Sequence, residues 1–208
     1  GTVVAVIDSG VELNHPDLSS RLWTNSADTC GNAVDDDSNG FVDDCNGWDF
    51  GGKDNNPNPE QSAGTSNWYH GTHVAGIIAA ARNNVGVVGL APDARIMPIK
   101  VMASNGAISS SAIYGALVYA ANNGAKVVNM SIATPPNTAR ASASAIESGI
   151  QYATARGVIV VAAAGNNSVD IGAQPLWPAN YSLYYPSVIT VGATTNTDAQ
   201  SSSSNYGA

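Results

Sequence analysis

Apolar segments of strand length alternate with segments of helix length along this chain, and this alternation limits its fold more than any other feature. The strand-length segments are rich in β-branched residues, which is typical of strands buried on both faces of a parallel sheet. We expect strands at 2–7, 95–101, 126–130, 158–163 and 188–191, short strands near 41–42 and 47–50, and helices that start at His70 and cover 109–122 and 141–156. Strands that alternate with helices predict an α/β fold, in which a parallel, doubly wound sheet is flanked by helices on both faces.

Composition limits the size and the partners of the protein. The 208 residues are 44% hydrophobic, enough for one well-buried domain that covers 1–208. Sixteen acidic residues against eight basic ones give a net charge of −8, which argues against nucleic acid or an anionic membrane as a partner. No apolar run approaches the ~18 residues that cross a bilayer. The chain begins at Gly1 with no signal peptide, so we expect a processed or excised piece.

The segment 70–80 combines an apolar helix with two histidines in its first turn. After Thr72, every residue except His73 is small or aliphatic, which predicts a helix that is buried all round. The positive end of the helix dipole disfavours a charged imidazole, so we expect His70 to be neutral and able to act as a general base. A histidine that merely ends a buried helix is the simpler alternative for this segment taken alone.

Asp8 directly follows the first expected strand. Open α/β sheets bind ligands at the carboxyl ends of their strands, so an acid at this position is a candidate for chemistry. An acid that caps the next turn is the alternative. No G-x-G-x-x-G sequence follows the strand, which disfavours a dinucleotide site.

Three segments together carry a family resemblance: Asp8-Ser9-Gly10, His70-Gly71-Thr72-His73-Val74-Ala75-Gly76 and Ala162-Ala163-Ala164-Gly165-Asn166. They closely resemble the subtilisin-like serine proteases, or subtilases, and they fit the subtilase order of Asp, His and Ser. The resemblance runs from Val3 to Gly207 and includes His15-Pro16-Asp17-Leu18 and Tyr185-Pro186-Ser187-Val188. It implies a single subtilisin-like peptidase domain that acts on extended polypeptides.

The resemblance implies a catalytic role for three residues. Asp8 would accept a hydrogen bond from one ring nitrogen of His70, at ~2.6–3.2 Å, and fix its tautomer. His70 would take the proton of a serine nucleophile, and the amide of Asn166 would donate to the oxyanion from the same edge of the sheet. His15 and His73 correspond to structural positions.

The nucleophile of subtilases lies in a Gly-Thr-Ser-Met segment that follows the region matching Ser204-Asn205-Tyr206-Gly207, and this motif does not occur in the 208 residues. We therefore expect a C-terminally incomplete domain that is inactive alone. The implied partners are a companion chain that carries the serine segment and a prodomain. A non-catalytic relative that binds peptides is the first alternative. A zinc hydrolase that uses His70 and His73 is the second, although H-E-x-x-H is absent.

The resemblance also implies two sets of substrate contacts. Gly106, Ala107 and Ile108 correspond to the strand that pairs with an extended peptide, and Ser131, Ile132 and Ala133 to the Ser-Leu-Gly wall of the main specificity pocket. Alanine in place of that glycine adds a methyl group. We therefore expect Ala133 to narrow the pocket and to strain any backbone with positive φ.

An acidic segment is a second, independent signal. Its oxygen-bearing residues at positions 1, 3, 5 and 9, with glycine at 6, match the front of an EF-hand-type loop, and the expected calcium ligands are Asp35, Asp37, Asn39, Phe41, Asp43 and Asp44. Position 12 is Asn46 instead of the usual glutamate, and a solvated acidic face is the alternative. The resemblance implies a second calcium site at Asp17 and Asn83 with carbonyls of Ala81, Val85 and Val87.

Cys30 and Cys45 bracket this acidic segment. A pair at this spacing fits a disulfide in an exported protein, and two free thiols fit the sequence as well. Together with the resemblance, the cysteines lead us to expect an extracellular, secreted and calcium-stabilised protein.

Overall fold

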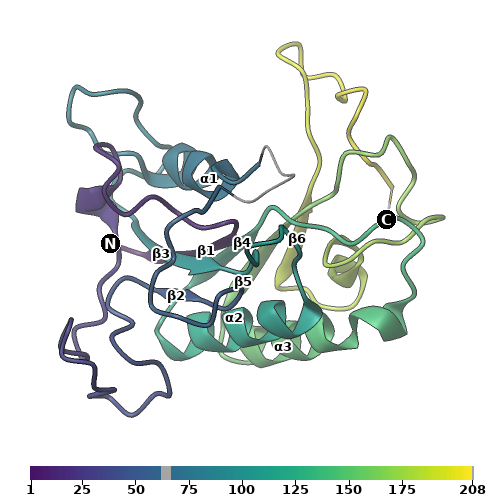
Figure 1. The fold of residues 1–208 in the computed structure, drawn as a ribbon. Helices are drawn as coiled ribbons and strands as arrows, with labels where there is room; N and C mark the ends of the chain where they lie inside the picture. The colour runs from purple at the N-terminus through teal and green to yellow at the C-terminus, as the bar shows by residue number, and fades with distance from the viewer. Residues whose placement is uncertain (62–66, 208) are drawn as a thin grey trace.

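The computed structural model describes residues 1–61 and 67–207, and in this part of the chain six parallel strands form one sheet in the order β2-β3-β1-β4-β5-β6 (Figure 1). The strands are β1 (Val3–Asp8), β2 (Trp48–Asp49), β3 (Arg95–Lys100), β4 (Val127–Met130), β5 (Ile159–Ala163) and β6 (Val188–Val191). The helices are α1 (His70–Ala79), α2 (Ser110–Asn122) and α3 (Ser144–Thr154), with 3₁₀ helices η1 (Ser19–Arg21), η2 (Arg140–Ala143) and η3 (Ala179–Leu183).

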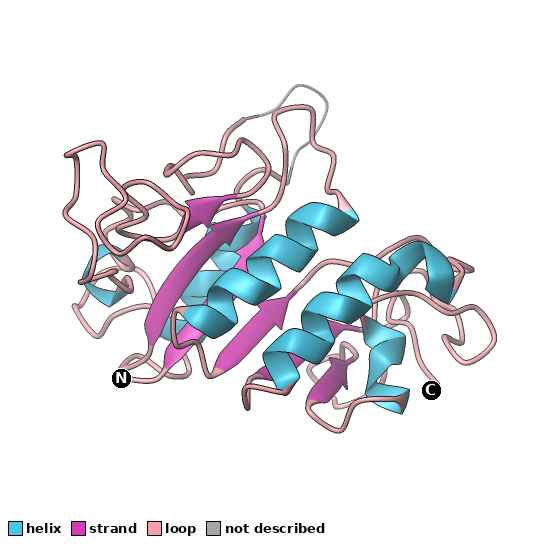
Figure 2. Ribbon diagram, turned by 90° about the horizontal axis from the view of Figure 1, so that it is seen from below, coloured by secondary structure: helices cyan, strands magenta, loops and turns pink. Residues whose placement is uncertain are grey.

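Helices cover the sheet on both faces, because alternate residues of the central strand β1 point to opposite layers. Ala5 and Ile7 pack in one apolar core with α2 and α3, whereas Val4 and Val6 pack in a second core with α1. Figure 2 shows two long helices side by side across the strands. The predicted α/β fold with a parallel sheet between helical layers is confirmed.

The parallel pairing brings the carboxyl ends of the strands to one edge of the sheet. Asp8 ends β1, Met130 ends β4 and Ala163 ends β5, and these three strands are neighbours in the order β1-β4-β5. The candidate residues that follow these strands in sequence therefore share one edge.

Two expected elements differ from the structure. Phe41 and Val42 lie outside any strand, because the Phe41 ring packs into an aromatic cluster, with centroids 5.0 Å from Trp48 and 5.1 Å from Tyr119. The helix expected at 141–156 is divided, since a 3₁₀ turn at Arg140–Ala143 precedes α3.

The expectation that α1 is buried all round is wrong. Its buried residues are Gly71, Ala75 and Ala79, which face the sheet, while Ile77 is 53% exposed and Leu90 in the following loop is 91% exposed. The sheet covers one side of α1, and a groove of about 710 Å³ follows the other side. None of the helices in the described residues is long and apolar enough to cross a membrane.

Candidate active site

Asp8 and His70 form a hydrogen-bonded pair at the carboxyl end of β1. His70 Nδ1 lies 2.8 Å from Asp8 Oδ1 and 3.0 Å from Asp8 Oδ2, so the predicted contact is present. Asp8 is 1% exposed, and the backbone N–H of Ser9 donates to its Oδ1 at 2.7 Å. Because the carboxylate can only accept, Nδ1 carries the hydrogen, and a neutral ring offers the lone pair of Nε2.

The Asp8 carboxylate changes the expected protonation of His70. Its hydrogen bond raises the pKa of the His70 imidazole above the usual 6.5, against the opposing effect of partial burial. The charged form is therefore favoured relative to a free imidazole, contrary to the expectation from the helix dipole. A carboxylate in direct contact outweighs the partial charge of a helix end.

The close approach of α1 to β1 depends on a glycine. A Cβ on Gly71 would collide with the carbonyl oxygen of Gly10 and lie 2.9 Å from Asp8 Cβ. Any larger residue directly after His70 would therefore push the first turn of α1 away from Asp8.

Asn166 lies in the turn that follows β5, at the same edge of the sheet as Asp8, and it is exposed. Gly165 precedes it with a φ of +95°, and the turn is held by a residue that sequence reasoning missed. Asn205 is 2% exposed; its amide donates to the Ala164 carbonyl at 2.8 Å, and its Oδ1 accepts the N–H of Asn167 at 2.8 Å. Asn205 thereby fixes the backbone on both sides of Asn166.

A pocket of about 170 Å³ opens where β4 ends, and it includes three of the six predicted substrate residues, Ile108, Ile132 and Ala133. The remaining walls come from α2, α3, the residues Thr134 and Pro135, and the segment around Trp177 and Pro178. Trp177 is a wall residue that sequence reasoning missed. The lining is mainly apolar, so the pocket suits an apolar side chain.

A short hairpin has the predicted substrate strand, Gly106 to Ile108, as its returning arm. Ile108 forms an antiparallel bridge with Met102, and the Ala103 N–H donates to the Ala107 carbonyl at 2.9 Å. Gly106 occupies the turn with a φ of +80°.

The other predicted wall runs on from β4. Ser131 Oγ accepts the Asn129 amide at 3.0 Å. The backbone of Ala133 does not have a positive φ, so the expected strain at this residue is wrong.

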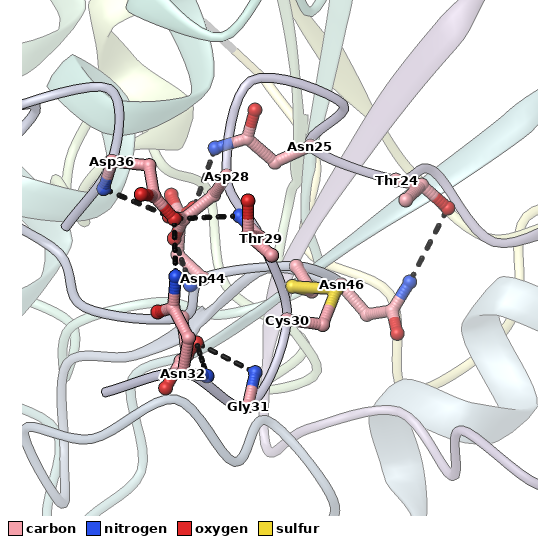
Figure 3. Close-up of a disulfide and its surroundings, with 12 residues drawn as sticks. Thr24, Asn25, Asp28, Thr29, Cys30, Gly31, Asn32, Asp36, Asp44 and Asn46 are labelled. Carbon is pink, nitrogen blue, oxygen red and sulfur yellow. Dashed lines mark hydrogen bonds between the residues drawn. A yellow bond between two sulfur atoms is a disulfide. The ribbon is translucent and has the colours of Figure 1, made fainter. Parts of the chain in front are cut away.

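The predicted disulfide between Cys30 and Cys45 is confirmed, with a Cα–Cα distance of 5.8 Å (Figure 3). The adjacent loop is held by Asp28, which is 7% exposed and was missed by sequence reasoning. Its two oxygens accept the N–H groups of Asp36 at 3.0 Å and Asp44 at 3.1 Å. The bridge and Asp28 therefore fix both ends of the acidic segment.

Part of the predicted calcium loop converges. The carboxylates of Asp35 and Asp37 both accept the Asn39 N–H, at 3.0 and 3.1 Å, and Asp37 and the fully buried Asp44 both accept the Asn25 amide, at 2.9 and 2.5 Å. Asn39 also donates its amide to Asp37 and Asp44. These side chains have the hard oxygen chemistry of a calcium site.

Asp43 does not fit this group. Its φ of +56° turns the side chain toward residues 31–33, where it accepts the Gly31 N–H at 2.7 Å. Phe41 contributes its ring to the aromatic cluster, which leaves only its carbonyl for a cation. Among residues 1–61 and 67–207, no group of three or more His, Cys, Asp or Glu side chains is arranged to hold a metal ion.

The second predicted calcium loop closes around Asp17, which is 4% exposed. The Asp17 carboxylate accepts the Asn83 amide at 3.2 Å and the Val87 N–H at 3.2 Å. The Ala81 N–H donates to the Asp17 carbonyl at 2.9 Å, and the Val85 N–H donates to Asn83 Oδ1 at 3.0 Å. These contacts gather the expected residues around Asp17, and the contacts with the Asp17 carboxylate are N–H donations from Asn83 and Val87.

The other histidines lie outside the Asp8–His70 pair. His15 Nδ1 accepts the Asp17 N–H at 3.2 Å, and His73 is exposed beside the groove along α1. Neither contact involves the carboxylate of Asp8.

The parallel sheet carries an aspartate–histidine pair and an apolar pocket at its carboxyl edge, so the structure is an α/β protein with a candidate catalytic site at that edge. The model of the subtilase family matches residues 1–208, so the chain belongs to the subtilase family.

Curated relatives and solved structures agree with this membership. The chain is 35% identical to the thermophilic serine proteinase of Bacillus sp. (strain AK1) and 34% identical to thermitase of Thermoactinomyces vulgaris, in both cases over 100% of this chain. It spans only 42% and 60% of those relatives' length.

The solved structures show the same partial coverage. A protease from Pseudoalteromonas arctica matches with a TM-score of 0.75 at 27% identity, over 100% of this chain and 60% of that one. An epidermin leader peptide processing serine protease from Staphylococcus aureus matches with a TM-score of 0.71 at 26% identity, over 100% of this chain and 50% of that one.

Proposed function

We propose that this chain is part of a serine endopeptidase that hydrolyses extended polypeptides with an Asp-His-Ser triad. The observation that carries the proposal is the pair in which buried Asp8 accepts a hydrogen bond from His70 Nδ1 at 2.8 Å. Asp8 holds the ring so that Nε2 can take the proton of a serine nucleophile and later protonate the leaving amine. Asn166, at the same edge of the sheet, donates its amide to the oxyanion.

The nucleophile is a serine in a Gly-Thr-Ser-Met segment, a motif that residues 1–208 do not contain. A companion chain or another part of the protein supplies it, and a prodomain is a further partner. The substrate lies along Gly106–Ile108 and places an apolar side chain in the pocket of about 170 Å³, which the methyl group of Ala133 narrows.

Calcium is proposed as a structural cofactor at two places. Asp35, Asp37, Asn39, Asp44 and the Phe41 carbonyl would hold one ion, and binding would have to rearrange these carboxylates, because they are not arranged for a metal ion in the described residues. Asp17, Asn83 and the carbonyls of Ala81, Val85 and Val87 would hold the other. A bound cation would offset the repulsion among the carboxylates of the acidic loop. A disulfide and calcium sites fit secretion to an extracellular compartment.

The test is peptide cleavage by the full protein that contains residues 1–208. Wild type should hydrolyse fluorogenic peptides and react with a fluorophosphonate probe, while His70→Ala should lose both activities. His73→Ala is the matched control, since His73 lies three residues away on the same helix and is exposed. Peptide binding without hydrolysis or probe reaction in the wild type would overturn the proposal and identify a peptide-binding relative.

A further inference from the structure

Ser9 connects the two elements that carry the Asp8–His70 pair. Its side chain is buried, with 2% of the residue exposed. The Ser9 hydroxyl donates to the Trp68 carbonyl at 2.9 Å and accepts the Gly71 N–H at 3.0 Å. Trp68 lies two residues before His70 and Gly71 one residue after it, so one hydroxyl holds the backbone on both sides of the histidine.

The first turn of α1 needs such a partner. The N-cap residue Tyr69 makes no side-chain capping hydrogen bond, and the first N–H groups of a helix have no partner within the helix. The Ser9 hydroxyl takes the place of a cap from 62 residues away in the sequence. It performs the task that an N-cap serine normally performs for its own helix.

The same residue also orients the other member of the pair. The Ser9 backbone N–H donates to Asp8 Oδ1 at 2.7 Å, the oxygen that lies 2.8 Å from His70 Nδ1. A second link, from the Glu12 N–H to Thr72 Oγ1 at 3.0 Å, ties the same loop to the first turn of α1 one residue after Gly71. Ser9 is therefore the connection nearest to the pair.

We propose that Ser9 is a positioning residue that holds the start of α1 against β1, so that His70 keeps its hydrogen bond to Asp8. This role of Ser9 depends on the proposed function only in that the Asp8–His70 pair would serve catalysis. The contact between Asp8 and His70 can be measured in the chain without catalysis, so the two proposals fail in different experiments.

The test is a pH titration of the imidazole resonances by NMR, which the chain suits because it has three histidines. Asp8→Asn identifies the His70 signal. In Ser9→Ala, the pKa of His70 should fall toward its usual value. The resonances of the other two histidines serve as internal references for a general effect of the substitution. Ser9→Thr keeps the hydroxyl and should restore the wild-type titration.

Ser19→Ala, at an exposed serine, is the control for a general effect of removing a hydroxyl. An unchanged His70 titration in Ser9→Ala, or equal changes in Ser9→Ala and Ser9→Thr, would overturn the proposal. If Ser9→Ala does not fold, Ser9→Cys keeps the volume and weakens the hydrogen bonds, and the same criteria apply to it. In the full enzyme, Ser9→Ala should lower kcat with little change in KM.

Discussion

Lys100 at the end of β3 is nearly fully buried, and replacing it should destabilise the fold strongly. Its Nζ lies 2.6 Å from Asp49 Oδ2, with side-chain exposures of 3% and 0%. Lys100→Met would leave the Asp49 carboxylate buried, with the N–H groups of Gly51 and Gly52 as its remaining side-chain partners among the described residues. Breaking a buried ion pair from one side costs roughly 3–5 kcal/mol. Glu60 lies 3.6 Å from the same Nζ but is about half exposed, so the loss of that second contact adds little, since surface pairs contribute ~0–1 kcal/mol.

Urea unfolding and thermal melting at pH 7 measure this loss. For a chain of this size each kcal/mol shifts Tm by about 2–4 °C, so Lys100→Met should melt roughly 6–20 °C lower. Lys126→Met is the control at an exposed lysine and should change stability by less than ~0.5 kcal/mol. A Lys100→Met variant within ~1 kcal/mol of wild type would show that Lys100 is not needed to balance the buried charge of Asp49.

Three further predictions concern the pair, the disulfide and calcium. The raised pKa of His70 implies that its pair with Asp8 stabilises the fold fully below pH 6.5 and loses this contribution as the pH rises through the folded-state pKa. Asp8→Asn should therefore melt below wild type by a larger margin at pH 5 than at pH 9. An equal margin at both pH values would contradict this prediction. Reduction of Cys30–Cys45, which closes a separation of 15 residues, should add two hydrogens in the intact mass and lower stability by about 3 kcal/mol. Calcium should raise Tm and a chelator should reverse the shift, with a smaller response in Asp37→Ala; a Tm that ignores calcium in both proteins would count against the site.

The architecture could be predicted because strand-length apolar runs encode burial on both faces of a sheet. Val4, Ala5 and Val6 pack into layers on both sides as their continuous apolar run predicts. The strand expected at 41–42 is wrong for a physical reason, because a loop can bury the Phe41 ring without strand pairing. The exposed side of α1 could not be predicted for a different reason. An apolar helix can be buried on all sides, but its sequence does not show whether other parts of the fold cover every side.

The candidate site was predicted through motifs, and its supporting residues were not. Asp8 and His70 were found because their side chain types indicate chemistry. Ser9 and Asn205 act on backbone groups of segments 62 and 41 residues away, and no local pattern reports such partners. The direction of the His70 pKa shift does not follow from its place at a helix start, because the adjacent Asp8 carboxylate has the larger effect.

The most direct test of the Asp8–His70 pair as a general-base system is the pH dependence of kcat/KM for peptide hydrolysis by the full protein. Activity should rise with pH on one ionisation, with a pKa above 6.5, since His70 must lose its proton to act as a base. In Asp8→Asn the rate should fall by about 10⁴-fold, a magnitude taken from known triad proteases and not worked out from this structure, and the ionisation should shift. A profile that is flat between pH 5 and 9, or one that Asp8→Asn leaves unchanged, would contradict the account.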